Sequence, residues 1–140
     1  MEHAVIPKGR ILCIEDHADT REVISVLLAQ AGYEVTCAES PFEALSLVKN
    51  TQRFDLYIVD TWLPGMSGLE LSNNLREFDG AIPILFFSAA SSEADRDRAF
   101  ECGAHAYLVK PVDTNKLAAK VSRLISESKQ RAAKTQSSTY

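Results

Sequence analysis

The chain has few of the features that are typical of disulfide-rich secreted proteins, zinc-binding domains or membrane proteins. Its 140 residues include only three cysteines, Cys13, Cys37 and Cys102, which are widely spaced and form no C-x-x-C pair. This spacing argues against a disulfide framework and against a structural zinc site, so we expect buried free thiols. No segment has the apolar length of a membrane span, and residues 1–10 lack the apolar centre of a signal peptide. These absences favour a cytoplasmic location.

Basic charge and nucleotide-binding loops are also missing. Lys and Arg number 15 against 19 Asp and Glu, a net charge of −4, so nothing indicates a surface for nucleic acid or membrane. The motifs G-x-x-x-x-G-K-[ST] and G-x-G-x-x-G are absent as well. If this chain receives a phosphoryl group, the donor must therefore be something other than a nucleotide bound in such a loop.

What remains is the composition of one globular domain. Apolar residues make up 46% of the chain, which is enough for a core without disulfides or metals. Strand-like and helix-like stretches alternate over residues 10–126, the predicted domain, which follows an extension over residues 1–9. Residues 127–140 are rich in Ser, Lys, Gln and Thr. Because they offer little to bury, they are predicted to be a disordered tail or a linker.

Capping signals predict where the helices begin. Ser40-Pro41-Phe42-Glu43 combines an N-cap serine, a proline at the first helical position and a reciprocal glutamate. Ser67-Gly68-Leu69-Glu70 repeats the serine and the glutamate at the same spacing. Further N-caps are expected at Asp19, Ser92 and Asp113.

The strands are short, and most are apolar throughout. Continuous apolar runs occupy residues 11–14, 56–59, 84–87 and 107–109, as in buried parallel strands. Residues 33–38 instead alternate apolar and polar side chains, as an edge strand does. With right-handed crossovers, the sequence predicts an α/β fold. Its five-stranded parallel sheet has the order 2-1-3-4-5, with helices on both faces.

Each apolar run is followed by a residue that handles phosphate or a hard cation. Glu15 and Asp16 follow the first run, Asp60 the second, Ser88 the third and Lys110 the fourth. Ligands of open α/β sheets bind beyond the carboxyl ends of the strands, so we expect these five side chains to converge. The carboxylate oxygens among them favour Mg²⁺ over zinc or copper.

This set of side chains leaves Asp60 as a candidate nucleophile. A carboxylate that attacks phosphorus forms an acyl phosphate. Lys110 and Mg²⁺ would offset the charge of the phosphoryl group, and Ser88 would donate a hydrogen bond to it. The residues therefore predict an aspartate that accepts and later loses a phosphoryl group.

Four motifs together resemble the receiver domain of response regulators, the acceptor half of two-component phosphorelays. They are Glu15-Asp16, the sequence DTWLPGMSG at residues 60–68, Ser88-Ala89 and Lys110-Pro111. The similarity runs over residues 10–126, most of the chain. It implies a flavodoxin-like fold and phosphoryl transfer from a histidine kinase or a histidine phosphotransfer protein.

The resemblance also implies individual roles. Asp60 matches the phosphoacceptor, Ser88 and Lys110 match the groups that contact the phosphoryl oxygens, and Ser88 with Tyr107 matches the switch pair. The Mg²⁺ ligands would be Glu15, Asp16, Asp60 and the backbone carbonyl of Trp62. The surface formed by the fourth helix, the last strand and the last helix would bind a downstream partner or a second copy of the chain.

The chain departs from the commonest pattern of that family at Glu15, Trp62, Leu63 and Ser88. The first two departures bear most directly on the site. Glu15 stands where Asp is frequent, and its longer side chain can reach the ion through water. Trp62 is bulky for a position beside the acceptor, and we hypothesise that it shields the acyl phosphate. A cis peptide is expected at Lys110-Pro111, whereas His17 is interpreted as an ordinary loop residue.

Other classes of function stay open at this point. An aspartate-dependent phosphatase would use similar groups, but it usually carries a second Asp two residues after the nucleophile, where this chain has Trp62. A phosphate-independent binding module on the same fold is the other alternative. The chain is either a stand-alone receiver or the receiver piece of a longer regulator. Outside residues 10–126 it has no room for a DNA-binding output domain.

Overall fold

A single parallel sheet organises the molecule. The computed structural model describes residues 6–51 and 53–137. The strands are β1 (Arg10–Ile14), β2 (Glu34–Ala38), β3 (Leu56–Val59), β4 (Ile84–Ser88) and β5 (Ala106–Val109). Their order is β2-β1-β3-β4-β5 and every neighbouring pair is parallel, which confirms the predicted fold class. The alternating strand β2 lies at one edge, as predicted, and β5 at the other.

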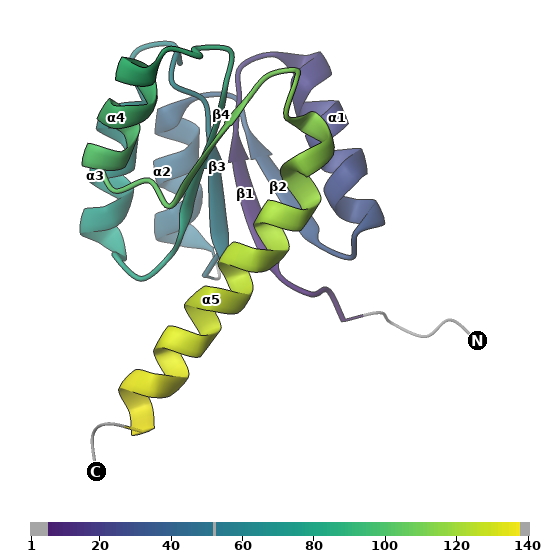
Figure 1. Cartoon of the computed structure of the whole chain (residues 1–140), viewed down its shortest axis with the longest axis vertical. Helices are drawn as coiled ribbons and strands as arrows, with labels where there is room; N and C mark the ends of the chain where they lie inside the picture. The colour runs from purple at the N-terminus through teal and green to yellow at the C-terminus, as the bar shows by residue number, and fades with distance from the viewer. Residues whose placement is uncertain (1–5, 52, 138–140) are drawn as a thin grey trace.

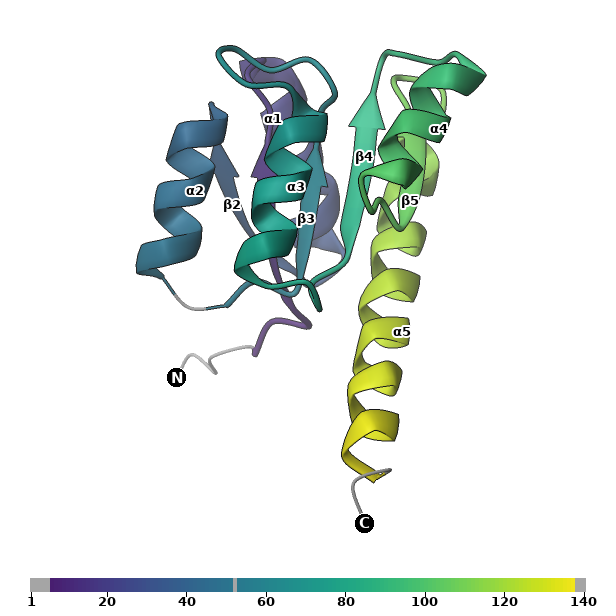
Figure 2. The same cartoon turned by 90° about the vertical axis from the view of Figure 1, so that its left-hand side faces the viewer.

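Helices cover both faces of the sheet. They are α1 (Ala18–Gln30), α2 (Pro41–Asn50), α3 (Gly68–Phe78), α4 (Glu93–Glu101) and α5 (Leu117–Ser137), with a 3₁₀ turn at Thr114–Lys116. Figures 1 and 2 show α1 and α5 on one face and α2, α3 and α4 on the other. The sheet therefore separates two apolar cores, one under each group of helices.

Strand periodicity divides the apolar side chains between those cores. On β1, Ile11 and Cys13 face α1 and α5, whereas Leu12 and Ile14 face the other three helices. All four side chains are buried. Burying an aliphatic side chain of this size contributes about 1.5–3 kcal/mol. A one-residue slip of β1 would exchange side chains between two differently shaped cores, so packing within each core specifies the register.

The helix N-caps follow the serine signals, whereas the reciprocal glutamate bonds predicted at Ser40 and Ser67 are not formed among the described residues. Side chains of Ser40, Ser67 and Ser92 each accept a hydrogen bond from the backbone of the first turn, as predicted. The prediction for Asp19 is wrong, because α1 begins at Ala18 and His17 is the N-cap residue. Asp19 lies in the first turn, where its charge favours the helix dipole. Asp113 precedes the 3₁₀ turn, and its carboxylate accepts a hydrogen bond from the Val109 backbone.

The end of the chain also differs from the prediction. Residues 127–137 belong to α5, which Figures 1 and 2 show running beyond the sheet, so disorder is the wrong description for them. Lys, Gln, Arg and Ala are good helix formers, and here they extend a helix whose first turns are already packed. Residues 138–140 and 1–5 lie outside the described residues. Among the described helices, none combines the length and apolar character needed to cross a membrane.

The three cysteines are free, as predicted, but only one of them is buried. Cys13 lies in the core, whereas Cys37 and Cys102 are half-buried. The reason is position: β2 is an edge strand that α1 covers incompletely, and Cys102 is the C-cap residue of α4.

Candidate functional site

Three strand ends bring the predicted acids and the amine together. Glu15 follows β1, Asp60 follows β3 and Lys110 follows β5, although 95 residues of sequence separate Lys110 from Glu15. The Lys110 ammonium donates to Glu15 Oε1 at 2.9 Å and to Asp60 Oδ2 at 3.0 Å. The Lys110-Pro111 peptide is cis, as expected. The lysine thus joins two carboxylates that arrive from different strands.

Burial sets the electrostatics of this group. Glu15 is only 2% exposed, and burial raises the pKa of its carboxyl by more than the Lys110 hydrogen bond lowers it. Burial also works against the charge of Lys110. The hydrogen bonds to Glu15 and Asp60 outweigh that effect, so the pKa of Lys110 is raised. The lysine therefore stays cationic between two carboxylates.

The acid cluster fits a hard divalent cation. Ligand atoms of Glu15, Asp16, His17 and Asp60 all lie within 4.8 Å of one another. Glu15 Oε2 is buried and has no hydrogen-bond partner. A buried carboxylate oxygen without a partner is costly, and a cation coordinated there would satisfy it. Carboxylate oxygens at this density suit Mg²⁺, which typically binds through one or two protein carboxylates and keeps several waters.

His17 also lies in this cluster, although the sequence interpretation favoured an ordinary loop histidine over a ligand. Its Nδ1 lies 3.3 Å from Glu15 Oε1 and 3.2 Å from Asp16 Oδ1, although the imidazole is largely exposed. His17 is the N-cap residue of α1, so the turn into that helix aims it back at the acid pair. Its place directly after two acids at a strand end was the available signal.

Ser88 and Tyr107 meet at one backbone residue. Ser88 is 0% exposed at the end of β4, and its hydroxyl accepts a hydrogen bond from the Ala90 N–H at 3.2 Å. Tyr107 is 4% exposed on β5 and donates its hydroxyl hydrogen to the Ala90 carbonyl at 2.6 Å. Its ring stacks on Phe86 with the centroids 6.1 Å apart. The loop from β4 to α4 is therefore tied to both predicted switch residues.

The loop after Asp60 shows how Trp62 is placed and reveals a contact of Gly68 that the sequence alone does not predict. Trp62 is 67% exposed, so its side chain projects from the surface next to the acceptor. Gly68, which the sequence places in a capping signal and in the motif at residues 60–68, donates its N–H to the Thr61 carbonyl at 2.8 Å. A Cβ atom at Gly68 would overlap the carbonyl oxygen of Asp60. Gly68 therefore allows α3 to begin directly against the backbone of the acceptor residue.

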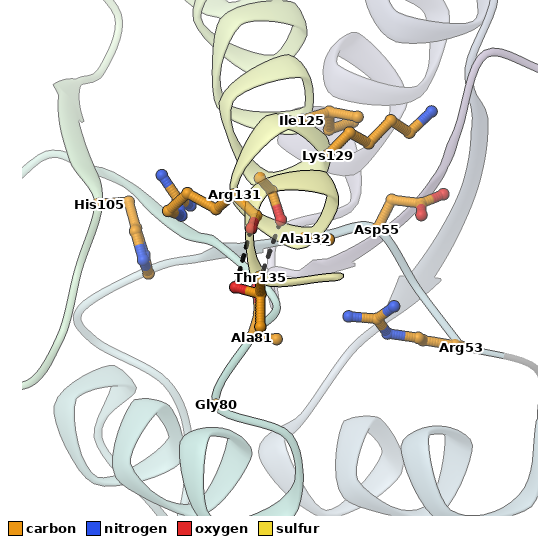
Figure 3. A pocket seen from close by; sticks show the side chains of 11 residues that line it. Arg53, Asp55, Gly80, Ala81, His105, Ile125, Lys129, Arg131, Ala132 and Thr135 are labelled. Carbon is orange, nitrogen blue, oxygen red and sulfur yellow. Dashed lines mark hydrogen bonds between the residues drawn. The ribbon is translucent and has the colours of Figure 1, made fainter. Parts of the chain in front are cut away.

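A cavity of about 470 Å³ lies at the opposite end of the strands, next to their amino ends (Figure 3). This end is called the opposite edge below. Its walls are α5 and the loops that precede β3, β4 and β5, and its ionisable side chains are Arg53, Asp55, His105, Lys129 and Arg131. Asp55 accepts a hydrogen bond from the Arg10 N–H at 2.8 Å, and Arg53 forms an ion pair with Asp79 at 3.1 Å. These two groups have local structural roles, and the cavity lacks the paired carboxylates of the other edge.

Comparison with known proteins agrees with this geometry. The family model for the response regulator receiver domain matches residues 11–122. The chain is 34% identical over 140 residues to the alkaline phosphatase synthesis transcriptional regulatory protein SphR of Synechococcus elongatus, covering 94% of this chain and 54% of that protein. It is 35% identical over 117 residues to the phosphate regulon regulatory protein PhoB of Pseudomonas aeruginosa, covering 82% and 51%. The chain thus spans about half the length of these curated relatives.

A solved structure agrees as well. The CheY-like response regulator receiver domain protein of Methanospirillum hungatei superimposes with a TM-score of 0.81 at 27% identity. The match covers 87% of this chain and 97% of that one.

Proposed function

Because this chain belongs to the response regulator receiver domain family, we propose that Asp60 accepts a phosphoryl group from a histidine kinase or a histidine phosphotransfer protein. One observation carries the proposal: the Lys110 ammonium bonds both Asp60 and the buried Glu15. Receiver domains are signalling phosphoacceptor modules rather than classical enzymes. The proposed location is the cytoplasm.

The transfer follows from the chemistry of these groups. The P–N bond of the donor phosphohistidine breaks, the histidine nitrogen keeps the electron pair, and an Asp60 carboxylate oxygen forms the new P–O bond. Lys110 offsets the negative charge of the phosphoryl oxygens, and the Ser88 hydroxyl can turn its hydrogen toward one of them. Water later hydrolyses the acyl phosphate to aspartate and phosphate.

We assign the Mg²⁺ ligands to Glu15, Asp16, Asp60 and the backbone carbonyl of Trp62. When bound, the ion supplies positive charge to the phosphoryl oxygens. The unpartnered Glu15 Oε2 and the clustering of the carboxylates support this assignment. The nearby His17 lies close enough to contact an ion or its water shell.

The switch is proposed to pass through Ala90. If Ser88 turns toward a phosphoryl group on Asp60, it releases the Ala90 N–H, while Tyr107 still bonds the carbonyl of the same residue. The Arg96 guanidinium of α4 lies 5.7 Å from the centre of the Tyr107 ring. Only Ala99 of α4 is buried, so this helix is held weakly and can shift at low cost. The α4–β5–α5 face would then bind a protein partner or a second copy rather than nucleic acid.

Fluorescence of Trp62, the only tryptophan, tests the proposal. We expect a saturable change on addition of Mg²⁺ and a further change with beryllofluoride, a mimic of the acyl phosphate. Asp60→Asn should lose the beryllofluoride response. Asp55→Asn, a matched change at the opposite edge, should keep it.

This fluorescence measurement and an assay of aryl phosphate turnover separate the alternatives. If folded protein responded to neither Mg²⁺ nor beryllofluoride, the phosphate-independent binding module would be the better description. Turnover of an aryl phosphate without stoichiometric labelling of Asp60 would favour a phosphatase instead.

A further inference from the structure

Two cysteines lie side by side at the β1–β2 edge of the sheet. Cys13 and Cys37 are register partners on these parallel strands, and both side chains pack into the core under α1 and α5. Neighbouring strands are about 4.8 Å apart, and disulfides join Cα atoms separated by about 4.4 to 6.8 Å. A bond between these two sulfurs therefore requires little movement of the backbone.

The two thiols differ in access. Cys13 is fully buried, whereas Cys37 is half-buried on the edge strand, which no further strand covers in the described residues. The Ser25 hydroxyl of α1 lies 3.2 Å from the Cys37 sulfur. Cys37 is therefore more accessible to an oxidant than Cys13.

The surroundings of Cys37 also favour its thiolate form. The hydrogen bond from Cys13 lowers the pKa of Cys37 to about 6, with further contributions from the Ser25 hydroxyl and the Arg21 charge. Cys13, in contrast, is fully buried beside it. A half-exposed thiolate beside a buried thiol is the arrangement that distinguishes a reactive cysteine from an inert one.

We propose that Cys37 is a site of reversible oxidation by hydroperoxides, and that Cys13 resolves the oxidised sulfur as an intramolecular disulfide. The site stands apart from Asp60 and does not depend on the proposed phosphoryl transfer. It differs from Cys102, which has no cysteine partner in the described residues.

The chemistry balances with hydrogen peroxide as the only co-reactant. The Cys37 thiolate attacks one peroxide oxygen, the S–O bond forms, the O–O bond breaks, and the departing hydroxide takes the proton that Cys37 released. Cys13 then attacks the sulfenic acid sulfur, the S–S bond forms and the S–O bond breaks. The second hydroxide leaves with the Cys13 proton as water. Two thiols and one peroxide give one disulfide and two waters.

Such a bond would tie the edge strand to β1 just below the acid cluster. Glu15 follows Cys13 by two residues, and Arg21 donates to the Glu15 backbone carbonyl at 2.9 Å. Arg21 also forms an ion pair at 3.3 Å with Glu39, which directly follows β2. Oxidation of Cys37 would therefore act on a network that holds the end of β1 in place.

The test treats the full chain with hydrogen peroxide, counts thiols in denaturant and identifies linked peptides by mass spectrometry. We expect two of the three thiols to be lost, a single link between Cys13 and Cys37, and full recovery with dithiothreitol. Cys102→Ser, the matched control, should react in the same way. Cys13→Ser should stop at a sulfenic acid on Cys37, which dimedone traps.

Reaction rates make the test decisive. Cys37 should react roughly tenfold faster than Cys102 in the same folded chain. Equal rates, a link that includes Cys102, or only links between chains would overturn the proposal. Asp60→Asn should oxidise like the unaltered chain, so failure of this site and failure of the phosphoacceptor are separable.

Discussion

The carboxyl ends and the amino ends of the strands differ in how far their charged side chains are buried. Beyond the carboxyl ends of the strands, Glu15, Asp60 and Lys110 bond one another with little solvent access. At the opposite edge, a cavity of about 470 Å³ is surrounded by exposed basic side chains, including those of Arg53 and Arg131. This cavity therefore lies where the charges are solvated. Buried and incompletely satisfied polar groups, not the size of a cavity, mark the functional edge.

The energetics of the two edges should differ in the same way. Removing one partner of a buried ion pair leaves an uncompensated charge and costs about 3–5 kcal/mol. An exposed pair such as Arg53–Asp79 contributes about 1 kcal/mol or less. Matched substitutions at the two ends of the strands therefore test this difference.

The largest effect is expected for Lys110→Met. Two carboxylates would lose their shared cation, so the free energy of unfolding should fall by about 3 kcal/mol and phosphorylation should slow about a hundredfold. Mg²⁺ should restore part of the stability by taking over the compensation. Urea unfolding and phosphoryl incorporation from a small-molecule donor measure both effects. Lys129→Met at the opposite edge is the control, and an equal loss there would contradict the contrast.

A smaller loss is expected for Gly68→Ala. The added Cβ overlaps the Asp60 carbonyl oxygen, so the backbone of the acceptor must move, at a cost of about 2 kcal/mol. The beryllofluoride response should weaken in parallel. At Gly80, near the other edge, a Cβ would meet only the Arg76 carbonyl oxygen at 3.4 Å, an ordinary contact. Gly80→Ala should therefore stay within about 0.5 kcal/mol in urea unfolding.

Trp62→Ala should change kinetics rather than stability. Its side chain is largely exposed beside Asp60, so its removal should open the acyl phosphate to water and speed dephosphorylation about threefold. Phe78 is a similarly exposed aromatic residue at the far end of α3, and Phe78→Ala should leave the rate unchanged. An unchanged rate in Trp62→Ala would falsify the shielding hypothesis.

The smallest effect belongs to His105. Its Nδ1 accepts a hydrogen bond from the Ile84 N–H at 3.1 Å, and burial, followed by Arg131 and Arg76, lowers its pKa below 6.5. The unfolded chain therefore binds this proton first, so stability is lost as the pH falls below 6.5. We expect the contribution to be about 1 kcal/mol or less. His105→Gln should flatten the pH dependence of urea unfolding between about pH 7 and pH 5, and identical profiles would contradict this assignment.

Several features were predictable because they follow from local pattern. Four apolar runs, one alternating run and three serine caps predict the strands and most helix starts. The convergence of Glu15, Asp60 and Lys110 follows, since parallel strands present their carboxyl ends at one edge. Other features were missed because local pattern does not determine them. Asp19 and His17 compete for the N-cap of α1, and Gly68 acts through a contact with the Asp60 backbone.

The α/β class, the strand order and the residues that meet beyond the carboxyl ends of the strands are predictable from the sequence. Hydrophobic periodicity reports burial, and burial selects the sheet topology. Only the tertiary structure decided the contacts that depend on register and packing. It placed Cys13 beside Cys37, aimed His17 at the acid pair and extended α5 to Ser137. Such contacts join residues whose own neighbourhoods carry no record of one another, so they appear only when the strands align and the helices pack.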